Sequence, residues 1–179
     1  LEESYGCLIG TYARDKDAVL AAALVAEAAL YYRELLNMSL LDVLQTIYDK
    51  FGYFLDTQVA CTLSGIDGRE QITEIMRILR ADERPEIGGL PVVRREYFDR
   101  AEVWEQADNA IKPLDFPQVD MLGFVFADGG FIRVRPSGTE PKIRFYFCIA
   151  GENEADAQAR VQTIKQDFFQ PVSQYIKKF

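Results

Sequence analysis

The first fifty residues of the chain show the pattern of apolar and polar positions expected of helices. Asp15 and Asp17 are N-cap candidates ahead of an Ala-rich stretch that continues to about Leu36. This stretch is apolar around most of its circumference, so we expect a helix that is buried on several sides. The chain starts at Leu1 without a methionine, and the start is expected to lie inside a longer protein.

A second helix is predicted over residues 40–51. Ser39 with Asp42 three residues later forms a pattern like a capping box, and Gly52 is a typical C-terminal stop. The pattern changes after this glycine, so the region from Lys50 to Tyr53 is the expected domain boundary.

The residues that follow have the pattern of strands and turns. Residues 53–63 are rich in β-branched and aromatic side chains and precede the turn sequence SGIDG. The runs MLGFVFA and GFIRVR are separated by DGG, which predicts a hairpin, and KIRFYFCIA is a further strand. Residues 81–118 contain four prolines and offer one strand-like piece, LPVVRREYF.

Two further helices are predicted between and after these strands. The helix over 69–80 places an apolar stripe on one side, which favours packing on a sheet over a binding groove. A helix after Gly151 begins with acidic residues, as the helix dipole favours, and carries a second stripe. The two stripes consist of Ile72, Ile75, Met76 and Leu79, and of Ala157, Val161, Ile164 and Phe168.

Composition narrows the function classes. The net charge is -8 with a pI near 4.7, which disfavours general binding of nucleic acid or anionic membranes, so an anion site must be a local positive pocket. Histidine is absent, and the three cysteines are widely spaced with no CxxC pair, which favours a reduced, cytoplasmic compartment. The longest apolar run, interrupted by Glu27, is shorter than the roughly 20 residues of a membrane span.

The segment VRPSGTEPKIRFYF brings cations and hydrogen-bond donors together at a hairpin tip. Arg133 and Arg135 share one face of their strand, and Lys142, Arg144 and Tyr146 share one face of the next. If the apolar faces of the two strands coincide, the cationic faces coincide too.

The loop between these strands has the chemistry of an anion site. Prolines at both ends make it rigid, Gly138 permits close backbone approach, and Ser137 and Thr139 supply hydroxyls. Arginine guanidinium groups match the oxygens of a phosphate. The charge of Glu140 opposes a bound phosphate unless it pairs with a cation. An ordinary hairpin with a solvated cationic face is the alternative.

The run RPSGTEPKIRFYF closely resembles the phosphate-binding loop of the α-D-phosphohexomutases, the phosphoglucomutase and phosphomannomutase family. The run EESYG, residues 2–6, resembles that family's sugar-binding loop. The resemblance implies a C-terminal fragment whose residues 1–51 end an α/β/α third domain. Residues 52–179 would then form a fourth, α+β domain with a mainly antiparallel sheet packed by helices, similar to the TATA-binding-protein fold.

The resemblance also implies roles for individual residues. The non-transferred phosphate of the substrate would be held by Arg135, Ser137, Gly138, Thr139 and Arg144, whereas Glu2 and Ser4 would meet sugar hydroxyls. The family's catalytic serine loop and its Mg²⁺-binding acidic loop have no counterpart in this sequence. We therefore expect no catalytic or metal-binding residue in the fragment, which should bind without catalysing.

For the full-length protein the resemblance implies an intramolecular phosphotransferase that works through a phosphoserine. Its strongest likeness is to the phosphoglucomutase branch, with glucose 1-phosphate and glucose 6-phosphate as substrates and glucose 1,6-bisphosphate as intermediate. Partners would be the hexose phosphate and the preceding domains of the same chain. The alternatives are a phosphomannomutase, a phosphopentomutase-type relative or a non-catalytic sugar-phosphate-binding module. Nucleic-acid binding is disfavoured by the acidic composition.

Overall fold

The structure is a computed structural model that describes residues 8–11, 15–63 and 67–176. The chain divides into two compact units, Leu1–Phe51 and Gly52–Phe179. Each unit is described by itself below.

The first unit contributes two helices whose starts follow from local side-chain chemistry. Helix α1, Ala18–Leu36, begins at Asp17, whose carboxylate accepts hydrogen bonds from the backbone N–H groups of Val19 (2.8 Å) and Leu20 (3.1 Å). Helix α2, Leu40–Phe51, begins with the predicted capping pattern. Ser39 Oγ accepts from the Asp42 N–H at 3.2 Å, and the Asp42 carboxylate accepts from the Ser39 N–H at 2.7 Å.

The expected burial of α1 is wrong for this chain, because none of the described residues of α1 or α2 is buried. The two helices contact each other, and the described residues of this unit contain no strand against which either could pack. Apolar side chains such as Val19, Val25, Leu35 and Leu41 remain more than half exposed. The apolar residues around α1 thus predicted the helix correctly but did not predict its exposure in this chain.

The second unit is built on an antiparallel sheet with strand order β1-β8-β7-β6-β3-β4-β5, and β2 pairs with β3 beside this path. In the described part of the chain, five of the pairings join strands that follow one another in sequence, whereas β3 pairs with β6 and β1 pairs with β8 over longer separations. The strands are β1 (Tyr53–Thr62), β2 (Glu86–Ile87), β3 (Leu90–Tyr97), β4 (Glu102–Glu105), β5 (Ala110–Pro113), β6 (Leu122–Phe126), β7 (Phe131–Pro136) and β8 (Lys142–Gly151).

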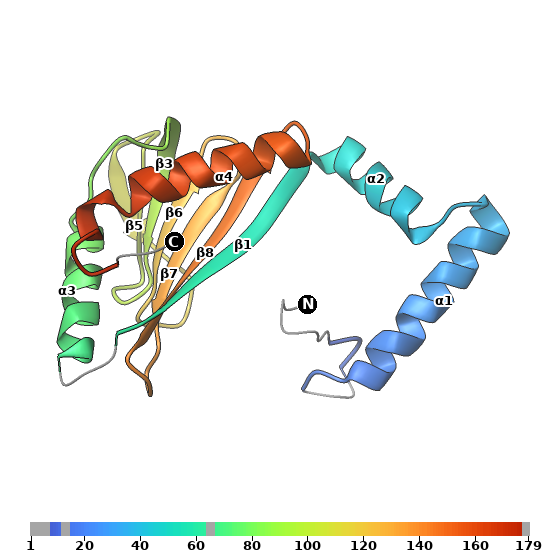
Figure 1. Cartoon of the computed structure of the whole chain (residues 1–179), viewed down its shortest axis with the longest axis horizontal. Coiled ribbons are helices and arrows are strands. Elements are labelled where there is room, and N and C mark those ends of the chain that lie inside the picture. Colours follow the sequence, from blue (N-terminus) through green and yellow to red (C-terminus); the bar gives the residue numbers. More distant parts are fainter. Residues whose placement is uncertain (1–7, 12–14, 64–66, 177–179) are drawn as a thin grey trace. The chain divides into compact units, whose positions relative to one another are not determined.

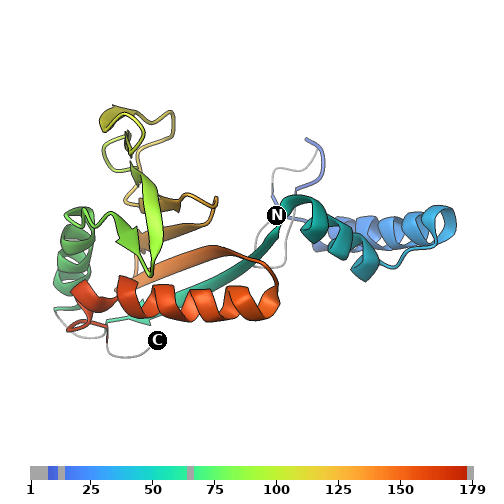
Figure 2. The same cartoon turned by 90° about the horizontal axis from the view of Figure 1, so that it is seen from above.

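Two helices cover one face of this sheet, as their apolar stripes predicted. Helix α4, Glu154–Phe168, lies across β1 and β8, and Figures 1 and 2 show it as a layer separate from the strands. Helix α3, Gly68–Arg80, and a short 3-10 helix, Gln170–Val172, pack beside it. All eight predicted stripe residues are buried, and they meet inward strand residues such as Phe124, Phe145 and Phe147. The opposite face, called the open face here, carries the alternate strand residues.

Strand β3 contains an irregularity that changes which side chains reach each face. Val92 pairs with Phe126 in β6 and Arg94 pairs with Val125, so one extra residue lies between these two pairs, as in a β-bulge. Beyond it Arg95 lies on the helix-covered face as the partner of Phe124, whereas Arg94 lies on the open face.

None of the helices in the described parts of the chain combines the length and apolar character needed to cross a bilayer.

Candidate functional site

The predicted coincidence of the two cationic strand faces is present in the structure. Strands β7 and β8 pair so that Arg135 lies directly opposite Arg144, and Arg133 opposite Tyr146. The alternate residues Val134 and Phe145 also face each other and are fully buried. Burial of the apolar side therefore fixes the register that brings the two loop-proximal arginines together.

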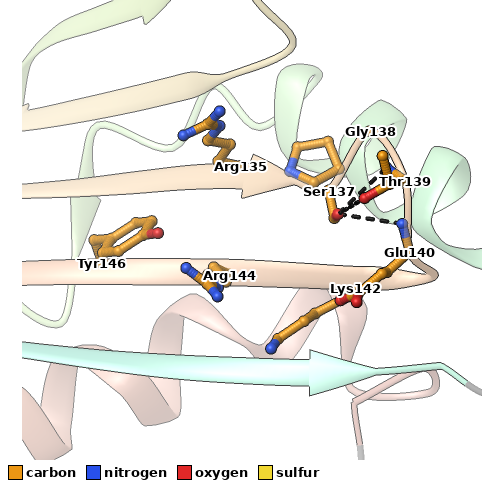
Figure 3. Close-up of a pocket in the computed structure, with 9 residues that line it drawn as sticks. Arg135, Ser137, Gly138, Thr139, Glu140, Lys142, Arg144 and Tyr146 are labelled. Atoms are coloured by element: carbon orange, nitrogen blue, oxygen red, sulfur yellow. Dashed lines mark hydrogen bonds between the residues drawn. The ribbon is translucent and has the colours of Figure 1, made fainter. Parts of the chain in front are cut away.

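These arginines and the loop after β7 enclose a hollow of about 310 Å³, which we call the Arg135 hollow. Figure 3 shows the two arginines on neighbouring strands, with the loop beyond their ends. The five predicted phosphate-binding residues all lie in its wall. The complete lining is Arg135, Pro136, Ser137, Gly138, Thr139, Glu140, Lys142, Arg144 and Tyr146.

The loop is shaped by its own hydrogen bonds. The Ser137 N–H donates to the carbonyl of Lys142 at 2.8 Å, which closes the loop at its base. Ser137 Oγ accepts longer bonds from the N–H groups of Glu140 (3.2 Å) and Thr139 (3.4 Å), drawn as dashed lines in Figure 3. Within the described part of the chain the Gly138 N–H donates no hydrogen bond, so this amide is the loop's most available backbone donor.

Two contacts from outside the hairpin hold the loop in place, and sequence reasoning missed both. Arg69, in the first turn of α3, donates through Nη2 to the Thr139 carbonyl at 3.3 Å. The Leu63 N–H donates to the Pro141 carbonyl at 2.9 Å. Gly68 allows this approach, since a Cβ there would lie 1.9 Å from the Leu63 carbonyl oxygen. Nothing in the local pattern around Arg69 indicated a contact with a loop 70 residues away.

Gly138 is different, because the chain itself does not require a glycine there. Its φ lies outside the left-handed region, and a Cβ added to it would have no atom of the described structure within 4 Å. The absent side chain leaves the backbone open toward the hollow that Gly138 lines. This geometry fits close approach of a ligand to the backbone.

Charge in the hollow is mainly positive. Three cationic side chains, Arg135, Lys142 and Arg144, line it together with one carboxylate, that of Glu140. Among the described residues, the Glu140 carboxylate forms no ion pair or hydrogen bond, and Arg135 forms no ion pair. The possible pairing of Glu140 with Lys142 or an arginine is therefore not seen here.

A half-buried ion pair continues the row of open-face side chains away from the loop. Arg133 Nη2 lies 2.6 Å from Glu96 Oε2, and the two side chains meet above Gly123. Burial lowers the pKa of Arg133, and the Glu96 carboxylate opposes that shift. Arg133 is thus ion-paired with Glu96, and it does not line the Arg135 hollow.

The remaining predicted site residues give two separate results. Glu2 and Ser4, predicted to contact the sugar, lie outside the described residues. A search of residues 8–11, 15–63 and 67–176 finds no group of three or more acidic, cysteine or histidine side chains placed to hold a metal ion. The described side chains therefore do not fit the Mg²⁺ site that the family resemblance implies elsewhere.

Fold and hollow together define an α+β domain that presents a braced, cation-lined loop at the end of a β-hairpin. Residues 90–170 match the model of the phosphoglucomutase/phosphomannomutase C-terminal domain. Phosphoglucomutase of Staphylococcus aureus is 35% identical over 163 residues, covering 91% of this chain and 29% of that protein. The Staphylococcus saprophyticus phosphoglucomutase is 35% identical over 155 residues, covering 85% and 27%.

Among solved structures, the open form of the Paramecium phosphoglucomutase pp63/parafusin matches with a TM-score of 0.57 at 16% identity. The match covers 93% of this chain and 29% of that one, and it supports the fold alone. The chain belongs to the α-D-phosphohexomutase family and corresponds to its C-terminal part. It spans less than a third of the length of the relatives named here.

Proposed function

We propose that this chain is the substrate-phosphate-binding part of a phosphohexomutase of the phosphoglucomutase kind. The observation that carries the proposal is the Arg135 hollow, where Arg135 and Arg144 face the same space as the Gly138 N–H and the loop hydroxyls. The 35% identity to phosphoglucomutases over most of the chain supports the choice of enzyme. Substrates of the whole protein would be glucose 1-phosphate and glucose 6-phosphate.

In this proposal the loop holds the phosphate that is not transferred. Guanidinium groups on Arg135 and Arg144 donate charge-assisted hydrogen bonds to the phosphate oxygens. Ser137 and Thr139 add hydroxyl donors after releasing their long mutual contacts. The brace from Arg69 to the loop keeps these donors in place before the ligand arrives, which lowers the ordering cost of binding.

The substrate must bind in two orientations, because the phosphate at C1 and the phosphate at C6 alternate as the one held. A loop that recognises a phosphate mainly through charge and backbone suits both orientations. Glu2 and Ser4 are proposed to contact the sugar hydroxyls, which exchange places between the orientations. Units 1–51 and 52–179 are proposed to be the end of the family's third domain and its fourth domain.

The chemistry of transfer is assigned to parts of the protein that this sequence does not contain. A phosphoserine would exchange its phosphoryl group with the bound sugar, and Mg²⁺ would supply charge neutralisation there. The described residues are proposed to bind and orient only. The chain alone should therefore bind hexose phosphate and should not convert it.

Titration calorimetry of the chain with glucose 1-phosphate tests this proposal. Arg135→Gln should weaken binding by at least tenfold, in line with the roughly 1.5–3 kcal/mol of a charge-assisted hydrogen bond. Arg77→Gln removes an equal charge from an exposed ion pair on α3 and should leave affinity unchanged. Absence of binding, or equal loss in both variants, contradicts the proposal. A coupled assay should detect no glucose 6-phosphate with the chain alone.

Mannose 1-phosphate is the second substrate candidate, because the matching family model names phosphomannomutase together with phosphoglucomutase. The 35% identity to phosphoglucomutases favours glucose. Competition between the two sugar phosphates for the full-length enzyme would separate these alternatives.

A further inference from the structure

A second hollow, of about 700 Å³, lies at the other end of the sheet, beside α3, β3, β4 and β5. Arg95 is one of the residues that line it, and we call it the Arg95 hollow. Arg95 lies on the helix-covered face of β3, whereas Arg135 lies on the open face, so the two hollows use opposite faces. The lining is Arg80, Glu83, Pro85, Val92, Arg95, Tyr97, Arg100, Trp104, Gln106, Asn109 and Ile111.

Arg95 is a buried cation without a compensating carboxylate. Arg95 is only 4% exposed, and it forms no ion pair among the described residues. Nη2 donates to the carbonyl of Arg84 at 2.5 Å, and Nε is buried without a hydrogen-bond partner. A buried charge of this kind is costly unless an anion or ordered water meets it.

The other arginines of the hollow are already neutralised. Arg80 Nε lies 3.2 Å from Asp99 and its Nη2 also contacts Asp120, while Arg100 Nε lies 3.3 Å from Glu102. The one carboxylate in the lining, that of Glu83, is exposed and forms no ion pair within the described ranges. The uncompensated positive charge is therefore concentrated on Arg95.

Flat apolar surface adjoins this charge. The Arg95 guanidinium stacks on the ring of Trp104, its cross-strand partner, at 4.4 Å from the ring centroid. Trp104 is held by a 3.0 Å hydrogen bond from its Nε1 to Asn109. The exposed Ile111 adds apolar contact area to the same wall, and the fully buried Val92 lies behind it.

We propose that the Arg95 hollow binds a small organic anion attached to a planar ring. The anionic group would complete the hydrogen bonding of Arg95, and the ring would lie against Trp104 and Ile111. Polar groups on the ring would meet Gln106 or Glu83 at the rim. An aromatic carboxylate and a mononucleotide share this chemistry. The site is separate from the Arg135 hollow and does not depend on the proposed mutase activity.

Trp104 makes the test site-specific, because the chain has one tryptophan and so one indole N–H signal. We would follow that signal by NMR during titration of the chain with benzoate and, separately, with uridine 5′-monophosphate. We expect saturable shifts with at least one probe. The probe with the lower dissociation constant identifies whether the ligand is an aromatic carboxylate or a mononucleotide. Benzyl alcohol, which lacks the charge, and inorganic phosphate, which lacks the ring, should bind at least tenfold more weakly. Equal binding of either control overturns the proposal.

Variants locate the site. Arg95→Met should weaken binding at least tenfold, whereas Arg94→Met, which removes a charge from the adjacent residue on the open face, should not. If Arg95→Met does not fold, Ile111→Glu tests the same site by adding a negative charge at a position that is 63% exposed. Arg135→Gln should leave the titration unchanged. Absence of shifts with both probes, or shifts that persist in Arg95→Met and in Ile111→Glu, overturns the proposal.

Discussion

Arg133 and Glu96 meet across the sheet above Gly123, with Nη2 and Oε2 separated by 2.6 Å. The two residues and the glycine between them come from three neighbouring strands, β7, β3 and β6, in cross-strand register. Their side chains are 22% and 8% exposed, so the pair is shielded from water on the open face. It holds Arg133 away from the phosphate-binding role proposed for Arg135.

Glu96→Gln should destabilise the protein substantially. The substitution leaves the Arg133 charge half-buried without its partner, and loss of one member of a buried pair costs about 3–5 kcal/mol. Because Arg133 is partly exposed, we expect about 2–4 kcal/mol in the free energy of unfolding, measured by urea denaturation. Glu74→Gln breaks an ion pair of the same 2.6 Å length on the exposed side of α3 and should change stability little. Equal effects would contradict a special role for the buried pair.

Gly123→Ala should weaken the same Arg133–Glu96 ion pair, because the strand residue beneath it would gain a side chain. A Cβ at this position would lie 2.8 Å from both Arg133 Nη1 and Glu96 Oε2, so the two side chains would have to separate. We expect a loss of about 1–3 kcal/mol in unfolding free energy. In a Glu96→Gln background most of this loss should disappear, and full additivity of the two changes would argue against the mechanism.

Two glycines near the loop should respond to alanine in opposite ways. Gly138→Ala adds a methyl group into open space, so stability should stay within about 1 kcal/mol of the parent protein. Glucose 1-phosphate affinity should nevertheless fall at least tenfold, since the methyl group would occupy the backbone approach. Gly68→Ala places a Cβ 1.9 Å from the Leu63 carbonyl oxygen and should cost about 3 kcal/mol of stability. Calorimetry and thermal unfolding of both variants separate binding from folding.

Cys148 should resist alkylation at neutral pH. Burial, followed by its hydrogen bond to Asp56, raises the pKa of this thiol from 9.0 to about 12. Since the unfolded thiol ionises at lower pH than the folded one, this group contributes a loss of stability as pH rises from about 9 toward about 12. Asp56→Asn should lower the pKa and accelerate reaction with iodoacetamide, measured by mass in a background with Cys7 and Cys61 replaced by serine. An unchanged rate would contradict the role of Asp56.

Asp167 ties the end of α4 to the turn before β3, and Asp167→Asn should loosen this connection. Its Oδ2 accepts from the Gly88 N–H at 2.6 Å, and its Oδ1 accepts from Arg84 Nη1 at 2.8 Å. Loss of the charge should cost about 1–3 kcal/mol, measured by thermal unfolding. Asp49→Asn, on the exposed surface of α2, is a matched control and should have a small effect.

Local chemistry made part of this structure predictable from sequence. The capping bonds between Ser39 and Asp42 involve residues three apart, so the start of α2 could be predicted. The placement of Arg135 and Arg144 on the same sheet face follows from strand alternation and the need to bury the other face. The family motif was equally local, since its proposed phosphate-binding residues lie within a single hairpin.

Long-range and context-dependent features were not predictable in this way. Arg69 reaches the loop only because α3 packs beside it, and no periodicity records that contact. Strands β4 and β5 are four residues each, too short for alternation to identify them among the prolines of residues 81–118. Burial of α1 was predicted wrongly, because an apolar circumference does not say which partner covers it.

The extra residue in β3 determines how its charges are shared between the two faces. In a strand of uninterrupted alternation Val92, Arg94 and Glu96 would share one face, so the residues beyond Val92 would be reversed. The bulge instead sends Glu96 to Arg133 and sends Arg95 to Trp104. Deletion of Val93 would therefore remove the bulge and leave Arg95 and Glu96 on the faces that they now occupy. The extra residue sets which face every later side chain of the strand reaches.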